Sequence, residues 1–255
     1  MHSASRRVYT RHCDPMRFGP KALAQRLVRR AHNLAALGGL TPARLAPYGA
    51  SLLSPQDLLD LQTVFAWTKD YIGKGHPELG RNGPICPFIP RALRDNRLLV
   101  TLRPEVRGPD AQQVEQLLLE HVAAFVRLYP ARQAKDAYNS LLLVFNKLPD
   151  SGGAVVDEVH TRQKSSLMRR GIMLSNFHPL CDKPGIKNAA FTLYKAPFPC
   201  IVMRHMSLHD IIFLSHNRPG FAAYHRRFAA QYSRGEVKDD HGYVALYQAA
   251  VQRFG

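Results

Sequence analysis

One apolar run limits the fold of this chain more than any other feature of its sequence. Residues 140–145 read Ser-Leu-Leu-Leu-Val-Phe, and Asn139 and Asn146 stand on either side of them. A run of this length, apolar at successive rather than alternate positions, is typical of a strand that is buried on both faces. The run therefore predicts a fully buried strand.

The segments around this run alternate between the period of a strand and the period of a helix. Further strands are expected at 97–102, 172–177 and 200–204. Helices are expected at 55–72, 110–128, 155–170, 219–232 and 243–254, with a short one after Ser207. Strands separated by helices, followed by two consecutive strands, predict an α+β fold with a single four-stranded sheet and helices packed on it. A ferredoxin-like arrangement is the simplest solution of this kind.

Charge divides the chain into two parts. The net charge is +16, and the first 45 residues carry nine Lys and Arg against the single acid Asp14, which is half of the excess. We expect a basic, partly helical arm over residues 1–50 and a single α+β domain over residues 51–255. An arm of this kind packs on the domain, contacts nucleic acid or an anionic membrane, or serves as a transit peptide, and the sequence leaves these alternatives open.

Several classes of protein are disfavoured by what the sequence lacks. No apolar run reaches the roughly 18–20 residues that span a bilayer, and no apolar stretch follows Arg6 and Arg7 as in a secretory signal. The four cysteines are scattered, which suits a reducing compartment, so the cytoplasm is expected. Dinucleotide and P-loop glycine motifs, the HExxH and GxSxG motifs, an EF-hand loop and paired zinc cysteines are all absent from the sequence.

The segment 73–90 is the most suggestive for chemistry. Its density of glycine and proline rules out a helix or a central strand, yet Ile85 and Phe88 are apolar, so part of the loop is expected to return to the core. Cys86 lies in this stiff loop between Pro84 and Pro87. A thiolate needs nearby positive charge or hydrogen-bond donors, and a Cys-Pro pair is compatible with an axial ligand of haem iron. An inert buried cysteine is the alternative.

Two later segments carry further polar candidates. His178 and Cys181 follow the strand at 172–177 with a spacing that could bind metal, although two ligands do not make a site. Arg204 could hold a carboxylate with both ends of its guanidinium group. His205 and His209 are four residues apart, but a helix beginning after Ser207 would leave His205 outside it, so the two do not form a simple two-histidine metal face.

Four motifs resemble those of a bacterial family that is known only as a domain of unknown function, over about residues 55–232. They are His76–Gly80, Gly83–Phe88, Asn176–Pro179 and Met203–Met206. The chain also resembles the YqcI/YcgG family, which includes haem-dependent enzymes that oxygenate amino-acid nitrogen. The shared features are the Cys-Pro-Phe loop before a strand, a long helix and a hydrophobic strand. This second resemblance implies haem and a thiolate or histidine ligand rather than zinc.

Two functions are therefore carried forward. The first is a haem-dependent oxygenase of small molecules, such as amino acids in secondary metabolism. In it Cys86 is the axial ligand, His178 a distal or alternative ligand, and Arg204 a clamp for a substrate carboxylate. The second is a basic binding module that holds an anionic metabolite or nucleic acid without catalysis.

Overall fold

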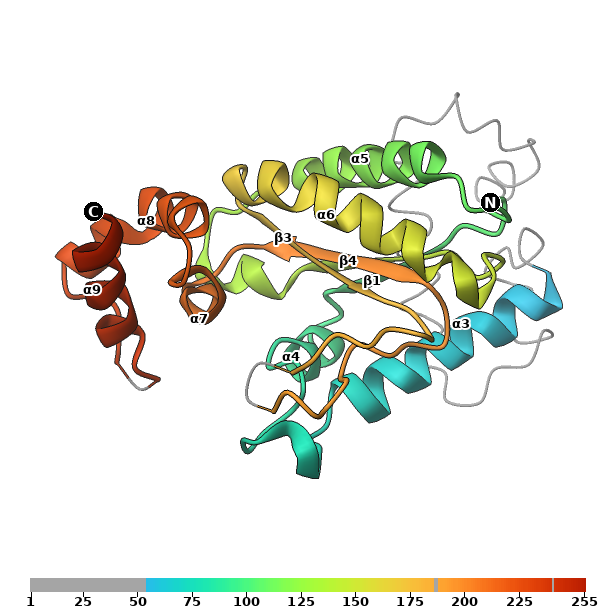
Figure 1. Cartoon of the computed structure of the whole chain (residues 1–255), viewed down its shortest axis with the longest axis horizontal. Helices are drawn as coiled ribbons and strands as arrows, with labels where there is room; N and C mark the ends of the chain where they lie inside the picture. Colours follow the sequence, from blue (N-terminus) through green and yellow to red (C-terminus); the bar gives the residue numbers. More distant parts are fainter. Residues whose placement is uncertain (1–53, 186–187, 240) are drawn as a thin grey trace, which may run out of the picture.

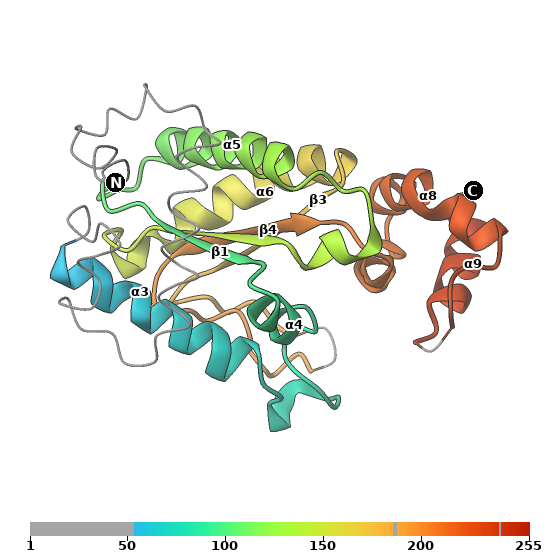
Figure 2. The same ribbon diagram turned by 180° about the vertical axis from the view of Figure 1, so that it is seen from behind.

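The computed structural model describes residues 54–185, 188–239 and 241–255. The predicted basic arm lies outside these residues. Within them, a central sheet is covered by helices on both faces, and three further helices lie beyond one end of the sheet (Figures 1 and 2).

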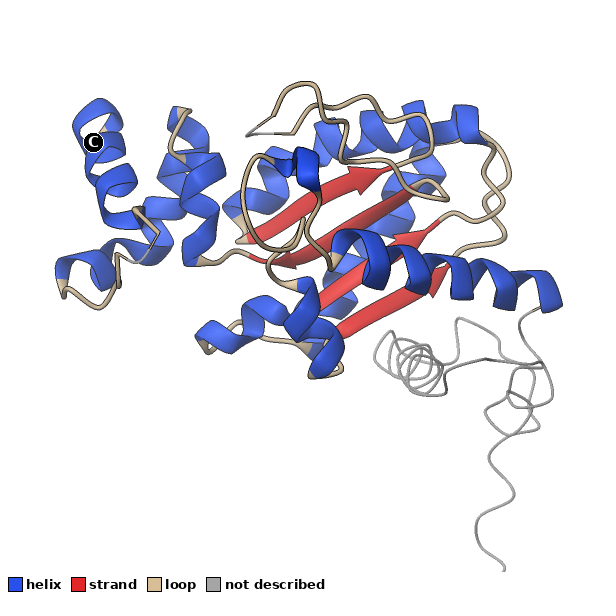
Figure 3. Ribbon diagram, turned by 90° about the horizontal axis from the view of Figure 1, so that it is seen from below, coloured by secondary structure: helices blue, strands red, loops and turns tan. Residues whose placement is uncertain are grey.

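The sheet has four strands in the order β1-β2-β4-β3. β1 and β2 pair in parallel, and β4 pairs antiparallel with both β2 and β3 (Figure 3). The predicted α+β fold with a single four-stranded sheet is thus confirmed. The strands are β1 (Leu98–Leu102), β2 (Ser140–Val144), β3 (Ile172–Phe177) and β4 (Cys200–His205).

The expected ferredoxin-like arrangement is wrong. That arrangement follows the chain order βαββαβ, whereas here two strand–helix units precede two consecutive strands. The connection from β1 to β2 brings the chain back beside β1, so β2 lies parallel to β1. The connection from β2 to β3 leaves a gap one strand wide between these two strands, and β4 fills this gap.

Two long helices, α5 (Ala111–Leu128) and α6 (Gly153–Arg169), cover one face of the sheet. Side chains alternate between the faces of a strand, and in β2 Leu141 and Leu143 belong to the core beneath these helices. Their neighbours Leu142 and Val144 point to the opposite face. β2 is buried at all five positions, as the apolar run predicts.

The opposite face is covered by α3 (Pro55–Trp67), α4 (Ile89–Arg94) and the long loop between β3 and β4. The predicted capping of α3 by Ser54 is present, since its hydroxyl accepts from the Asp57 N–H at 3.1 Å. A π-helical turn, Thr68–Ile72, extends α3. The indole N–H of Trp67 donates to the Lys195 carbonyl at 3.0 Å, which ties the long loop to this helix.

The C-terminal helices α7 (Ile211–Leu214), α8 (Arg218–Ser233) and α9 (Tyr243–Phe254) form a third apolar cluster beyond the end of the sheet (Figure 1). Aromatic rings dominate it: Tyr232 and Tyr247 stack with centroids 3.7 Å apart. Met168 at the end of α6 joins this cluster to the main body. None of the helices in the described segments has the length and apolar character needed to cross a membrane.

Candidate functional site

Cys86 lies where the glycine- and proline-rich loop returns to the sheet. Its N–H donates to the Ile72 carbonyl at 3.0 Å, and the N–H of Ile85 donates to the Lys74 carbonyl at 2.8 Å. The Arg81 guanidinium donates to the carbonyls of Pro84 and Ile85 at 2.8 and 2.9 Å. The loop is therefore held in place on both sides, and it sets the half-buried Cys86 against the core beneath α3 and α4, as the sequence predicts.

The surroundings of Cys86 act on its thiol in opposite directions. Burial raises the pKa of the thiol, whereas the charge of Arg204 and hydrogen bonds from the backbone N–H groups of Phe88 and Ile89 lower it. The nearby Asp210 raises it again, and the net pKa lies above the usual 9.0. At neutral pH Cys86 therefore carries its proton in the free protein. The groups beside it would stabilise the thiolate if a bound positive charge balanced the charge of the sulfur.

Arg204 points to the same face of the sheet as Cys86. Its two terminal nitrogens donate to the two carboxylate oxygens of Asp210 at 2.8 and 2.6 Å. The guanidinium carbon also lies 4.1 Å from the centroid of the Phe88 ring. Arg204 thus lies against Phe88, two residues after Cys86. A substrate carboxylate would have to compete with Asp210 for the guanidinium group.

Aromatic side chains from three other segments gather around Phe88. The rings of Tyr138 and His209 each lie 5.7 Å from it, and the Tyr243 hydroxyl lies 2.7 Å from Nδ1 of His209. Tyr138 ends a 3₁₀ turn (Ala134–Tyr138), His209 lies in the turn after β4, and Tyr243 begins α9. We call this group the Cys86 site; it consists of Cys86, Phe88, Tyr138, Arg204, His209 and Tyr243.

His178 does not join the Cys86 site. It follows β3 on the face covered by α6, where its Nε2 lies 3.1 Å from Asp157 Oδ2. Met173 is the partner of Arg204 in the sheet, so His178 lies five residues, or ~16 Å, further along the strand. The structure therefore brings Cys86 and Arg204 together and leaves His178 at the other end and on the other face.

The remaining histidine and cysteine candidates also lie outside the Cys86 site. His178 is 6% exposed and its ring packs against Gly153, while Cys181 is buried nearby. His205 bonds to the Tyr129 carbonyl on the face covered by α5, away from His209. In residues 54–185, 188–239 and 241–255, no group of three or more His, Cys, Asp or Glu side chains is arranged to hold a metal ion.

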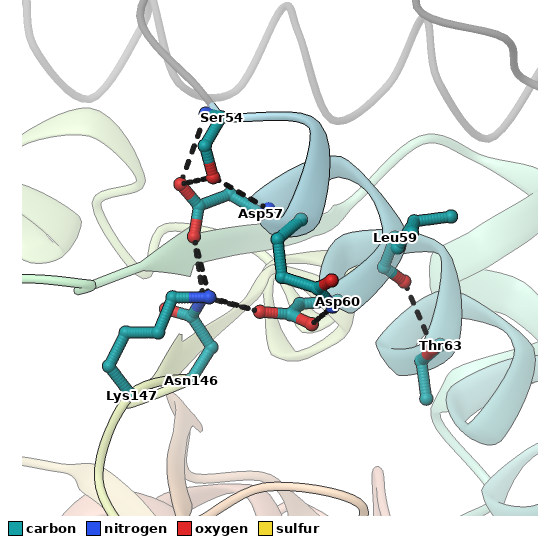
Figure 4. Close-up of polar contacts among 8 residues, drawn as sticks. Ser54, Asp57, Leu59, Asp60, Thr63, Asn146 and Lys147 are labelled. Carbon is teal, nitrogen blue, oxygen red and sulfur yellow. Dashed lines mark hydrogen bonds and ion pairs between the residues drawn. The ribbon is translucent and has the colours of Figure 1, made fainter.

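A second polar cluster, which the sequence analysis missed, lies at the start of α3 (Figure 4). The side-chain amide of Asn146, just after β2, donates to Asp57 and Asp60 at 2.8 Å each. The Lys147 ammonium lies 3.2 Å from Asp57 Oδ1 and 2.8 Å from Asp60 Oδ2. Burial raises the pKa of both carboxyl groups, but these hydrogen bonds outweigh it and the pKa of each is lowered. The cluster therefore fastens α3 to the end of β2.

Comparison with known proteins identifies a family but no characterised relative. A search of curated proteins found no match, and a search of solved structures found none. A family model described as a domain of unknown function, DUF6875, matches residues 61–239. The expected kinship with a domain of unknown function is thereby confirmed, whereas nothing in these comparisons supports the likeness to the YqcI/YcgG family. With most of its length matched by that model, the chain belongs to the DUF6875 family.

Proposed function

We propose that this protein binds haem through the Cys86 thiolate and oxygenates a small molecule, such as an amino acid. The observation that carries the proposal is the setting of the Cys86 sulfur. The backbone N–H groups of Phe88 and Ile89 and the charge of the Arg204 guanidinium all lower the pKa of its thiol. Hydrogen bonds to the sulfur are one of the means by which a protein tunes a thiolate-ligated metal centre.

The same setting favours a ligand over a free nucleophile. A nucleophilic cysteine needs a depressed pKa, whereas burial raises the pKa of Cys86 above its usual 9.0. A metal-bound thiol is deprotonated outright, because the metal's charge outweighs the cost of burial. Cys86 therefore suits a role in which its negative charge forms on binding an iron-centred cofactor.

The side chains beside Cys86 pack closely on one another. The guanidinium carbon of Arg204, which is paired with Asp210, lies 4.1 Å from the centroid of the Phe88 ring, and the Tyr138 ring lies 5.7 Å from that centroid. Bound haem would supply the oxygen chemistry, while the protein supplies the ligand and its surroundings. The oxygenase activity rests only on the resemblance of the Cys-Pro-Phe loop to that of haem-dependent enzymes, which is an analogy between sequence features.

Haemin titration of the full-length protein tests this function. We expect a Soret band, and a thiolate signature in the spectrum of the reduced carbon monoxide complex. Cys86→Ala should remove that signature. Cys181→Ala, Cys200→Ala and His178→Ala should keep it, since none of these side chains is part of the Cys86 site. A spectrum with no saturable Soret band, or one that Cys86→Ala leaves unchanged, would overturn the proposal.

A non-catalytic role in binding an anionic metabolite or nucleic acid is the second candidate. It is favoured by the positive charge around the site, where the exposed Arg81 donates to the backbone carbonyls of Asn82, Pro84 and Ile85 and Arg91 lies 4.5 Å over the Tyr138 ring. Titration of the full-length protein with inorganic phosphate and with a single-stranded oligonucleotide tests it. Salt-sensitive binding that Arg91→Gln weakens, by protein that takes up no haemin, would favour this second function.

A further inference from the structure

Exposed cations gather at one end of the sheet, where α5 and α6 both end. The strands β1, β2 and β3 all point the same way, so the two helices that connect them run back and finish where β2 and β3 begin. At this end α8 packs against α6 (Figures 1 and 2). We call this surface the basic end; its exposed cations are Arg127, Arg132, Lys135, Arg169, Arg170, Arg226 and Arg227.

The basic end has no matching negative charge. None of its cations forms an ion pair with a residue of the described segments. By contrast Arg162, two turns before Arg169 on α6, is paired with both Glu115 and Glu158. Asp136 lies in the loop after α5, but its carboxylate accepts from two backbone N–H groups of that loop at 3.0 and 2.9 Å. The positive charge of this surface is therefore left for an anion from outside.

Arg227 is the cation whose position is best defined. Its guanidinium group lies against the backbone of Gly171, just after α6, where a Cβ would be 2.1 Å from the guanidinium carbon. The φ of Gly171 is 80°, a conformation that favours glycine, so no side chain stands between the two. No group in the described segments accepts a hydrogen bond from Arg227. Partial burial and the charge of Arg226 lower its pKa. A planar donor group is thus held beside a like charge with its N–H groups unused.

The helix dipole does not account for this surface. Cations in the last turn of a helix interact with its free carbonyls, which explains Arg127 and Arg169. Arg226 and Arg227 lie about two turns before the end of α8, where this interaction has faded. They add charge from a second helix to the end of α6, where arginines are already present.

The chemistry of the surface favours phosphates over a lipid bilayer. A surface that binds membranes places large apolar side chains beside its cations. The most exposed large apolar residues of the described segments are Leu59 and Leu180, which follow the start of α3 and the end of β3 at the opposite end of the sheet. Binding of single strands uses aromatic rings that stack on bases, but the Tyr129 ring after α5 packs on Phe125.

We propose that the basic end binds the phosphate backbone of double-stranded nucleic acid. Arginine matches phosphate with two parallel N–H groups, and contacts to phosphate position a protein on a duplex without reading its bases. The surface shares no residue with the Cys86 site, nor with Arg81 and Arg91 beside it. The inference is therefore independent of the proposed haem-binding function.

Fluorescence anisotropy of a labelled duplex with the full-length protein tests the proposal. Each phosphate contact contributes about 0.9 to the slope of log affinity against log salt concentration. We expect Arg226→Gln/Arg227→Gln to weaken binding by ~10-fold or more at low salt and to reduce this slope by about 2. Arg107→Gln/Lys195→Gln removes the same charge from exposed positions outside the basic end and should keep the slope of wild type.

A footprint on the wild-type protein gives a second readout. Phenylglyoxal modifies free guanidinium groups, and peptide mass spectrometry should show that the duplex protects Arg226 and Arg227 but leaves Arg107 reactive. Absence of saturable duplex binding, or an equal loss in both double variants, would overturn the proposal. So would a loss confined to Arg91→Gln, which would place the anion beside the Cys86 site. Binding to phosphatidylserine vesicles without binding to the duplex would overturn it in favour of a membrane. Haemin titration is a separate measurement, so a failure of the proposed function would leave this inference standing.

Discussion

The Lys147 ammonium lies 2.8 Å from Oδ2 of Asp60, and this contact joins the start of α3 to the end of β2. Asp60 is only 5% exposed and Asp57 only 6%, whereas the Lys147 side chain is 24% exposed. Lys147 therefore balances the charge of two buried carboxylates from a partly exposed position. Removal of one partner leaves buried charge behind, which costs more than the pair itself contributes.

Lys147→Met should therefore destabilise the fold. We expect the free energy of unfolding to fall by about 2 kcal/mol, less than for a fully buried pair because water reaches the lysine. Urea unfolding followed by circular dichroism measures this change. Lys135→Met, at an exposed position that has no ion pair with the described residues, is the matched control and should stay within ~0.5 kcal/mol of wild type. Equal stability of Lys147→Met and wild type would contradict the account of the cluster.

His160 should make stability depend on pH in the mildly acidic range. Burial, with the charges of Lys164 and Lys183, lowers the pKa of its imidazole from 6.5 to about 4 in the folded protein. The unfolded chain therefore binds the proton first, so the stabilisation is present above pH 6.5 and is lost as the pH falls towards about 4.

His160→Gln should remove this dependence, because glutamine does not titrate. Urea unfolding at a series of pH values should show a loss of order 1–3 kcal/mol in wild type that is absent from the variant. His216→Gln, at an exposed site, should keep the wild-type profile. If the stability of wild type and of His160→Gln depended on pH in the same way, His160 would not be the source of this dependence.

Gly153 allows the His178 ring to lie against the start of α6. A Cβ at this position would overlap the ring, which is buried and bonded to Asp157. Alanine is otherwise favoured over glycine in a helix by up to ~1 kcal/mol, but here overpacking should give Gly153→Ala a net cost of about 1–3 kcal/mol.

Thermal unfolding measures this cost, and a second substitution identifies its cause. The double variant Gly153→Ala/His178→Ala should lose less stability than the sum of the losses in the two single variants. Gly108→Ala, where a Cβ would meet nothing within 4 Å, is the control. Strict additivity in the double variant would show that the ring is not the obstacle.

Alkylation should report the state of the Cys86 thiol. Cys86 is half-buried, whereas Cys181 and Cys200 are 1% and 2% exposed, so iodoacetamide should modify Cys86 well before these two. Because burial raises the pKa of Cys86, its alkylation rate should still be rising at pH 9.0. Peptide mass spectrometry over a pH series measures both, with urea-unfolded protein as the reference. A plateau below pH 9.0 would indicate an activated thiolate and argue against the ligand role.

Local features of the sequence predicted the individual elements well. β3 spans the predicted residues 172–177, because its apolar pattern ends where Pro179 follows. The Ser54 cap and the Asp110 cap both begin helices as expected, since each places a side-chain oxygen over free N–H groups. One helix was not expected: α4 follows the glycine- and proline-rich loop, and Pro90 lies in its first turn, where its missing N–H has no cost.

The order of the strands was not accessible in this way. Pairing of β4 with β2 joins residues about sixty positions apart, for example Ser140 with Arg204, and no local pattern encodes it. The position of Arg204 beside Cys86 is a consequence of that pairing. His178 was misplaced for a related reason: its position after β3 directs it to the face of α6, while Arg204 faces α4. Tyr243 gave no signal, because only the tertiary fold brings α9 to the site.

The position of β4 also sets the order in which the molecule can assemble. β1 and β2 can pair once residue 144 has been made, but β3 has no neighbour in the sheet until β4 arrives with residues 200–205. Until then β2 presents an open, apolar edge, the kind of surface that promotes association between chains. The last strand therefore completes the sheet, and a chain that stops short of residue 200 leaves β3 without a strand partner.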